Sequence, residues 1–183
     1  RILRALGANE PSSAGSPKAT VEAAISALAQ DPLQLLSVSR FYSTPAFPPG
    51  SGPDFVNAAV VVSSTLSPSA LLTRLHQIEA NFGRTRTKRW QSRTLDIDLL
   101  ACGHQVVPDH ATVRHWLDLD LADQKVTTPD QLILPHPRLQ DRGFVLIPLY
   151  DIAPDWRHPI LGTTVAEMVA ALPEAEKAEI RPL

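Results

Sequence analysis

The residues most suited to chemistry lie in one short segment, residues 83–98, which reads GRTRTKRWQSRTLDID. Two aspartates close this segment, Asp96 and Asp98, at spacing i, i+2 on a predicted strand. That spacing directs both carboxylates to one face of the strand, about 6 to 7 Å apart. Two carboxylates on one face are costly to bury together unless a cation lies between them. The pair therefore predicts a cation site.

Basic residues crowd ahead of these aspartates. Five of the 17 basic residues of the chain fall within ten positions, and they are Arg84, Arg86, Lys88, Arg89 and Arg93. Mg²⁺ takes one or two carboxylates together with substrate phosphates, and two ions about 3.5 to 4 Å apart can clamp the oxygens of a phosphoryl transfer. Arginines beside such ions would bind phosphate oxygens. The combination predicts a nucleoside-triphosphate site without a P-loop, because no GxxxxGK[ST] string occurs.

Both features also have a simpler interpretation. An Asp-x-Asp pair is common on the solvated face of a strand, and an arginine-rich loop is common on a protein surface. The two features adjoin each other, with Trp90 inside the basic segment. Residue types alone leave the site and the solvated surface open as interpretations.

A second candidate segment begins at Thr44 and Pro45, with Phe47 beyond them and Phe55 and Asn57 after a proline-rich stretch. An aromatic ring could stack on a flat heterocycle there while the amide reads its edge. Taken alone, Phe55 could equally be core, and Asn57 could bond to the backbone.

The third candidate segment, LPHPR at 134–138, fixes His136 between two prolines, with Arg142 and Phe144 beyond it. A histidine held in this way suits a phosphate contact. A rigid surface turn explains the same residues equally well.

The elements that position these residues follow from periodicity and turn residues. In chain order they are strand 1–6, helix 19–29, strand 35–42, strand 55–63, helix 68–82 and strand 95–101. Ser67 is expected to cap the second helix, with Pro68 at its first position. The β-α-β-β-α-β order predicts an α+β fold: a ferredoxin-like antiparallel sheet with helices packed on it.

A C-terminal extension follows, and we expect residues 1–183 to form a single domain with an insertion at about 108–129. This insertion is acidic and predicted to be partly helical around 113–121. Pro148 is expected to break the apolar stretch 144–149. A final helix is expected to begin at Thr164 and to end by Pro173.

Composition excludes several classes of protein. The single cysteine, Cys102, allows no intramolecular disulfide and favours a reducing compartment. No apolar run approaches the roughly 20 residues that span a bilayer, and residues 1–14 lack a signal-peptide core. The net charge of −2 excludes a chain that is basic overall. We therefore expect a cytoplasmic protein.

With these motifs in place, the sequence resembles the 6-hydroxymethyl-7,8-dihydropterin pyrophosphokinase family. The matching strings are FYSTPAF (41–47), DFVNAAV (54–60), IEANFGRTR (78–86), RWQSRTLDIDLL (89–100), LPHPR (134–138) and RGFVLIPLYDIAP (142–154). They occur in order across nearly the whole chain. The resemblance implies a ferredoxin-like fold and an ATP-dependent pterin diphosphokinase of folate biosynthesis, a transferase that moves pyrophosphate from ATP to the hydroxymethyl oxygen of the pterin and releases AMP.

The resemblance also implies roles for individual residues. Asp96 and Asp98 would hold two Mg²⁺ ions, and Arg84 and Arg93 would serve catalysis. The pterin would be bound by Thr44, Pro45, Phe47, Phe55, Asn57, Trp90 and Phe144. ATP would be bound by Glu79, Arg86, Arg89, Leu99, Leu132, Ile133, His136 and Arg142. Both substrates are small molecules, so we expect neither nucleic acid nor membrane as a partner, and we expect a monomer.

Three departures from the family pattern accompany these matches. Gln91-Ser92 stands where Gly-Pro is usual, which bears on how the loop closes over its substrates. His76 stands where a glutamine is common, and Phe55 replaces a more common tyrosine, which keeps stacking but loses a hydroxyl. None of these departures changes the aspartates.

Two other functions compete with this one. Ferredoxin-like sheets commonly bind RNA through exposed aromatic residues. The aromatic content of 5%, the isoelectric point near 6.3 and the lack of an RNP1-like string count against an RNA-binding module. A catalytically silent interaction domain is the other alternative, and the presence of both aspartates, Arg84 and Arg93 counts against it.

Overall fold

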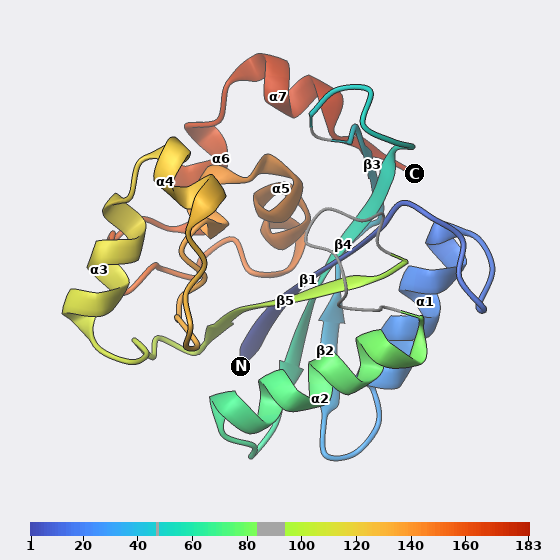
Figure 1. Cartoon of the computed structure of the whole chain (residues 1–183), viewed down its shortest axis with the longest axis horizontal. Coiled ribbons are helices and arrows are strands. Elements are labelled where there is room, and N and C mark those ends of the chain that lie inside the picture. Colours follow the sequence, from blue (N-terminus) through green and yellow to red (C-terminus); the bar gives the residue numbers. More distant parts are fainter. Residues whose placement is uncertain (47, 84–93) are drawn as a thin grey trace.

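The computed structural model describes residues 1–46, 48–83 and 94–183, and their strands form one sheet (Figure 1). The strands are β1 (Ile2–Ala8), β2 (Gln34–Val38), β3 (Tyr42–Thr44), β4 (Phe55–Ser63), β5 (Asp96–Cys102) and β6 (Arg181–Pro182). The order across the sheet is β5-β1-β4-β3-β6, and β2 also pairs with β4. All of these pairs are antiparallel. The predicted α+β fold with an antiparallel sheet is confirmed.

Two interleaved βαβ units build the central strands. Helix α1 (Pro17–Leu28) connects β1 to β2, and α2 (Pro68–Asn81) connects β4 to β5. Because β1 and β2 both run antiparallel to β4, and β4 and β5 both run antiparallel to β1, each unit holds a strand of the other between its own two strands. The element order through β5 is therefore the predicted one, apart from the strand expected over 35–42.

That predicted strand is wrong in one respect, since the chain forms two strands there, β2 and β3. They pair with opposite ends of β4. Between them the Ser39 N–H still donates to the Ala59 carbonyl at 2.9 Å, but the Ala59 N–H donates to the Ser39 hydroxyl at 2.8 Å, so a side chain replaces one backbone acceptor of the ladder. As a result Thr44, which lies beyond the strand predicted over 35–42, forms the end of β3.

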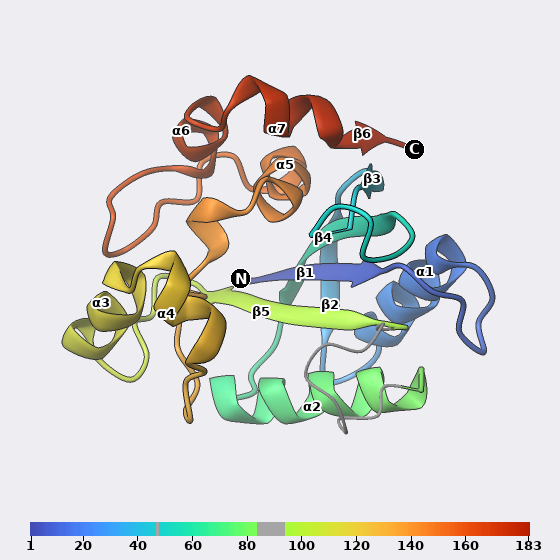
Figure 2. The ribbon, with the colours of Figure 1, turned by 45° about the horizontal axis from the view of Figure 1, so that its top comes forward.

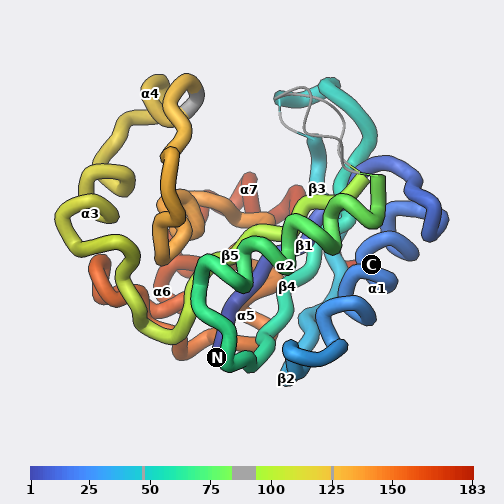
Figure 3. Tube along the Cα trace, turned by 60° about the horizontal axis from the view of Figure 1, so that its bottom comes forward, coloured from blue at the N-terminus to red at the C-terminus, as the bar shows by residue number. Residues whose placement is uncertain are grey.

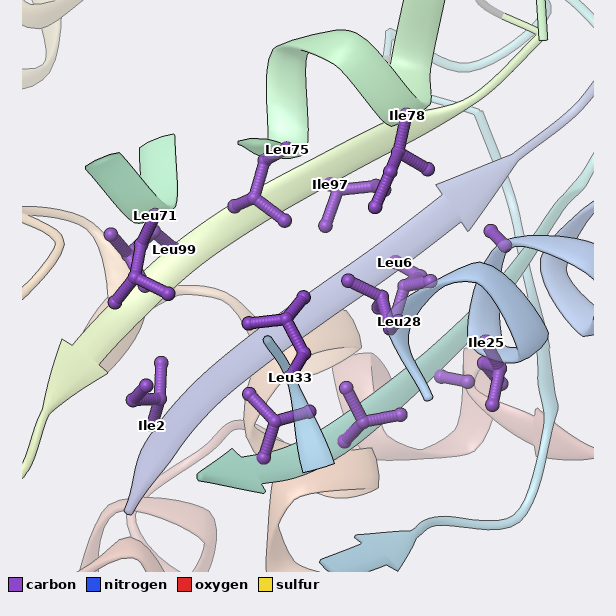
Figure 4. Close-up of a cluster of buried hydrophobic side chains, with 14 of the residues drawn as sticks. Ile2, Leu6, Ile25, Leu28, Leu33, Leu71, Leu75, Ile78, Ile97 and Leu99 are labelled. Carbon is purple, nitrogen blue, oxygen red and sulfur yellow. The ribbon is translucent and has the colours of Figure 1, made fainter. Parts of the chain in front are cut away.

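Helices α1 and α2 cover one face of the sheet, called here the α1/α2 face (Figure 2). Each begins at a serine whose side chain accepts a backbone N–H, Ser16 from Ala19 and Ser67 from Ala70. The predicted Ser67 cap is thus confirmed. The apolar residues between helices and sheet form one core, which includes Leu6, Leu28, Leu75, Ile78, Ile97 and Leu99 (Figure 4).

Arg4 is the exception on this face. It pairs across the sheet with Val60 and Leu99, which both belong to the apolar core, and its side chain is fully buried. No described residue accepts a hydrogen bond from any of its three guanidinium nitrogens. Burial lowers the pKa of Arg4 to about 10, so the guanidinium still carries its charge near neutral pH.

The opposite face, the α5 face, is covered by α5 (Gly143–Ile152) and α6 (Val165–Ala170). The prediction that Pro148 breaks this stretch is wrong, because α5 continues through it. Pro148 removes one helical hydrogen bond. Burial of Val145, Leu146 and Leu149 at 1% exposure or less against the sheet outweighs that loss.

The region predicted as partly helical contains two helices, α3 (His110–Asp118) and α4 (Leu121–Val126). Asp109 and Asp120 each cap a new helix start, since their carboxylates accept N–H groups at 2.7 and 2.8 Å. Both helices stand to one side of the sheet (Figure 3).

Thr164 caps α6 as expected, but α6 is not the final helix. After Pro173 the chain forms α7 (Glu174–Glu179) and then β6. Pro173 precedes α7 at its cap position and does not end the helical region, and acidic residues in the first turn of α7 suit a helix N-terminus. No helix in the described ranges is long and apolar enough to cross a membrane.

Candidate active site

The carboxylate pair and the predicted pterin-binding residues meet on the α5 face of the sheet. Gly7 of β1 pairs with Asp96 of β5 on one side and with Asn57 of β4 on the other. Directly paired residues of an antiparallel sheet point to the same face. Neighbouring strands lie about 4.8 Å apart, so Asp96 and Asn57 are separated by about 10 Å with only a glycine between them.

Gly7 lets the Asn57 side chain lie close to the strand. A Cβ at position 7 would stand 2.7 Å from Asn57 Oδ1, so any side chain at this position would force the Asn57 amide to move. The Asn57 amide donates a hydrogen bond to Thr44 Oγ1 at 2.6 Å, and both residues are buried. Half-buried Phe55, two residues before Asn57 on β4, pairs with Thr44 of β3. An oriented amide thus stands beside an aromatic ring, as reading a flat heterocycle requires.

The two aspartates are placed by contacts on either side of β5. Asp98 Oδ2 lies 3.7 Å from Arg142 Nη1, and each side chain is 29% exposed. On the outer edge of β5, the carboxylate of buried Glu79 accepts a hydrogen bond from the Ile97 N–H at 2.8 Å. Ile97 lies between the aspartates, so this bond fixes the backbone that carries both carboxylates.

His136 is held as a neutral imidazole next to this pair. Its backbone N–H donates to the Leu100 carbonyl at 2.8 Å, and its Nδ1 accepts the Arg138 N–H at 3.2 Å. Burial, followed by the nearby Arg142 charge, lowers the pKa of His136 to about 3, although Asp96 acts in the opposite direction. With Nδ1 as an acceptor, the proton resides on Nε2, which can donate to an anionic oxygen.

Arg142 and Phe144 come from the beginning of α5. The Arg142 guanidinium lies 5.6 Å from the centre of the Phe144 ring, a cation–π distance. Phe144 is 39% exposed, which is unusual for an apolar ring and leaves part of its surface open to stacking. One helix start therefore supplies both a guanidinium cation and an aromatic ring.

Strand β3, which carries Thr44, is held by Asp151 of α5. The Asp151 carboxylate accepts hydrogen bonds from the backbone and guanidinium of Arg40 and from the Tyr42 hydroxyl at 2.8 Å. Burial and the hydrogen bond to Asp151 raise the pKa of Tyr42 to about 12, so its hydroxyl stays protonated and donates near neutral pH. The network ties the third strand to the helix that covers the sheet.

The other residues implied by the resemblance are buried, partly buried or exposed, or lie outside the described residues. Leu99 and Ile133 are buried, and Leu132 packs partly against the α1/α2-face core. Pro45 is exposed beside β3. The remaining ones lie outside the described residues and stay predictions: Phe47, Arg84, Arg86, Arg89, Trp90 and Arg93.

Two residues that shape the site were not predicted from the sequence. Gly7 falls just beyond the strand predicted over 1–6, so the signal of a glycine inside a strand, which often marks a close approach, becomes visible only because β1 extends to Ala8. Asp151 gave no signal, since its partners Arg40 and Tyr42 lie 111 and 109 positions away in the chain.

Comparison with known proteins gives the same picture. The family model for 7,8-dihydro-6-hydroxymethylpterin-pyrophosphokinase matches residues 3–154. A 2-amino-4-hydroxy-6-hydroxymethyldihydropteridine pyrophosphokinase of Pseudomonas aeruginosa is 37% identical over 174 residues, which cover 94% of this chain and 92% of the relative. The enzyme of that name from Synechocystis is 38% identical over 131 residues, 72% of this chain, and the match spans only 56% of that relative.

Solved structures agree on the fold. A structure titled HPPK-DHPS in complex with substrates aligns with a TM-score of 0.67 at 14% identity, covering 98% of this chain and 46% of that one. Plasmodium falciparum HPPK-DHPS aligns with a TM-score of 0.63 at 15% identity, covering 92% of this chain and 44% of that one. The chain thus spans less than half of these two proteins. By its family match and its relatives, the chain belongs to the 7,8-dihydro-6-hydroxymethylpterin-pyrophosphokinase family.

Proposed function

We propose that this chain transfers the pyrophosphoryl group of ATP to the hydroxymethyl oxygen of 6-hydroxymethyl-7,8-dihydropterin and releases AMP, a step of folate biosynthesis. Family membership supports this proposal. The observation that carries it is the row Asn57–Gly7–Asp96. A flat bicyclic ring read at one edge by Asn57 would extend over Gly7 and bring its hydroxymethyl arm to the aspartates.

Further residues fit the pterin side. Thr44 holds the Asn57 amide, and Phe55 and Phe144 offer rings on the sheet and on α5. We assign the flat ring to the space between these two side chains. Pro45, Phe47 and Trp90 complete the proposed pterin-binding set by resemblance.

The phosphate groups of ATP would lie on the side of the aspartates opposite to the pterin. His136 donates from Nε2, and Arg142 offers a guanidinium that pairs with Asp98 until an anionic oxygen competes for it. The nucleotide-binding set proposed by resemblance adds Glu79, Arg86, Arg89, Leu99, Leu132 and Ile133. Glu79 would act on the site through Ile97, by holding the strand between the aspartates.

Asp96 and Asp98 fit Mg²⁺ as hard oxygen ligands on one face of a strand. The described residues contain no group of three or more His, Cys, Asp or Glu side chains that could hold a metal. Two carboxylates suit ions that take their remaining ligands from substrate phosphates and water. When bound, two such ions would neutralise charge on the triphosphate and on the attacking oxygen.

The chain's own residues then act by position and charge. No protein nucleophile is required, because phosphoryl transfer needs alignment of the attacking oxygen and stabilisation of charge on the transferred group. Asn57 and the rings fix the pterin, His136 and Arg142 orient the phosphates, and Arg84 and Arg93 would stabilise the charge that develops. We also propose that residues 1–183 act as one monomeric, cytoplasmic domain in which 108–129 form an insertion.

One experiment tests the reaction. The purified chain is given ATP, Mg²⁺ and the reduced pterin, and nucleotides are separated by chromatography. We expect one AMP released for each pterin consumed. Release of ADP, or release of AMP that does not depend on the pterin, would contradict the proposal, and tight salt-sensitive RNA binding without ATP would favour an RNA-binding module.

A further inference from the structure

Residues 174–183, called here the C-terminal strap, touch both sides of the proposed pterin site. They comprise α7 and β6 and lie beyond residues 3–154, the part matched by the family model. One end of the strap contacts the start of α5, which carries Phe144. The other end pairs with β3, which carries Thr44.

The contact with α5 combines a hydrogen bond from Glu176 with close packing of Ile180. Glu176 Oε1 accepts the Gly143 N–H at 2.9 Å. The residue at the cap position of α5, Arg142, makes no side-chain cap of its own, so Glu176 supplies the acceptor from a distant part of the chain. A Cβ at position 143 would stand 2.7 Å from Glu176 Oε1 and 2.8 Å from Ile180 Cδ1, which shows how closely the strap lies against this helix start.

The contact with β3 is a short ladder. Arg181 pairs with Ser43 and Pro182 pairs with Tyr42, while the Leu183 N–H donates to the Phe41 carbonyl at 2.9 Å. β3 is only three residues long, and β4 lies on its other side. The strap therefore holds this short strand from its outer edge.

We propose that the C-terminal strap sets the spacing between the two walls of the pterin site, and that Glu176 is a positioning residue for pterin binding. This inference rests on the proposed function. Arg142 and Phe144 flank the peptide that Glu176 holds, so loss of its hydrogen bond would release the helix start that presents the ring. Arg142 is also assigned to the ATP phosphates, but its guanidinium is held separately by Asp98 of β5 at 3.7 Å, so the strap should act on the pterin more than on ATP.

Substitutions at Glu176 separate this role from a general loss of stability. Glu176→Met has a similar length but no acceptor, whereas Glu176→Gln keeps an acceptor oxygen for the Gly143 N–H. We expect Glu176→Met to raise the KM for the pterin about tenfold, with kcat and the KM for ATP within about twofold of wild type. Glu176→Gln should restore a pterin KM close to that of wild type.

Glu174→Met is the matched control on the same helix. Glu174 is 91% exposed and pairs only with Lys177 among the described residues, so the control should leave all three constants unchanged. A second variant that ends at Ile180 removes the β3 ladder but keeps Glu176, and it should raise the pterin KM in the same selective way. This variant keeps the test decisive if Glu176→Met does not fold.

The outcomes distinguish the two proposals. If wild type does not release AMP in response to the pterin, the proposed function is wrong. If wild type is active, the strap inference is overturned by an unchanged pterin KM in Glu176→Met, by equal increases in the two KM values, or by a Glu176→Gln variant as impaired as Glu176→Met. Each variant is assayed at least about 20 °C below its own Tm, so unfolding does not enter the comparison.

Discussion

The two faces of the sheet are built differently along the same strands. On the α1/α2 face, apolar residues continue along the strands apart from Arg4 of β1, as in Ile97, Leu99 and Cys102 of β5. On the α5 face, the buried apolar residues occupy only part of each strand, and polar residues follow: Asp96 and Asp98 on β5 and Asn57 on β4. Burial of apolar residues on the α1/α2 face stabilises the whole sheet. The α5 face can then carry polar and charged side chains that would be costly to bury in a closed core.

This difference shows how one strand serves two purposes. Alternation sends neighbouring residues to opposite faces, so Ile97 is buried in the core while the aspartates on either side of it point to the α5 face. We therefore expect substitutions on the α1/α2 face to change stability without changing turnover. Substitutions in the polar part of the α5 face should change turnover or substrate binding with little change in stability.

The largest effect is expected at Asp98. Asp98→Asn removes a charge from the carboxylate pair and should lower turnover by about 10³-fold, equivalent to roughly 4 kcal/mol of transition-state stabilisation, with the free energy of unfolding nearly unchanged. Turnover is measured by AMP release and stability by urea denaturation. Ile97→Val is the matched control on the opposite face, expected to cost about 1 kcal/mol of stability and to leave turnover intact. If Asp98→Asn retained more than a tenth of the wild-type turnover, the assignment of turnover to the polar part of the α5 face would be contradicted.

Arg4 tests the α1/α2 face. Its guanidinium is buried among apolar residues with no hydrogen-bond acceptor in the described part of the chain. Replacing buried charges with apolar residues of similar volume often stabilises proteins by about 1 to 4 kcal/mol, so Arg4→Met should raise the free energy of unfolding by that amount and leave turnover unchanged. A Tm below that of wild type would show that Arg4 has a stabilising partner.

Acid should lower the free energy of unfolding through His158. This residue is fully buried, and its Nδ1 accepts the N–H groups of Ile160 and Leu161. Burial lowers the pKa of His158 to about 4, below the ordinary value of 6.5. The unfolded chain therefore takes up a proton first, so the contribution is complete above pH 6.5 and is lost as the pH falls towards 4. Between pH 7 and pH 5, wild type should lose about 2 kcal/mol more stability than His158→Asn, which keeps an acceptor oxygen but does not titrate.

His136 has a lowered pKa of the same origin and is present in both proteins, so its contribution cancels in this difference. Urea denaturation at the two pH values provides the measurement. Equal losses in the two proteins would show that His158 is not the titrating group.

The smallest effect concerns Gly7. Gly7→Ala would push a Cβ against Asn57 Oδ1 and turn the amide away from its ligand. We expect the pterin KM to rise about tenfold, which corresponds to roughly 1.4 kcal/mol, with the KM for ATP unchanged. Ala8→Gly is the control on the α1/α2 face and should cost about 1 kcal/mol of stability without changing either KM. An unchanged pterin KM in Gly7→Ala would show that Asn57 does not read the pterin.

Local patterns predicted what depends on local interactions. Ser67 with Pro68 identified the start of α2, and the spacing of Asp96 and Asp98 placed both carboxylates on one face. The wrong predictions fall where contacts with residues distant in the chain determine the local structure. α5 passes through Pro148 because the sheet buries it, and the division between β2 and β3 depends on a contact from Ser39 to Ala59.

The candidate site shows the same limit. Residue types indicated Asn57, His136 and Arg142, but the contacts that orient them come from Thr44, Arg138 and Asp98, and only the fold brings these together. No local pattern predicted α7 or β6, since β6 is two residues long and exists only through its pairing with β3. The roles of Arg84 and Arg93 stay predictions from the resemblance.

The pairing of β3 with β6 has a consequence for how the protein folds. It joins Tyr42 to Pro182, 140 positions apart in the chain, so it must close a very long loop for a ladder of only two residue pairs. The central strands and their helices are held by far more buried surface, and we expect them to form first. Folding would thus pass through a state with a complete core and an unfinished edge, and this edge would also be the first part to open when the native protein fluctuates.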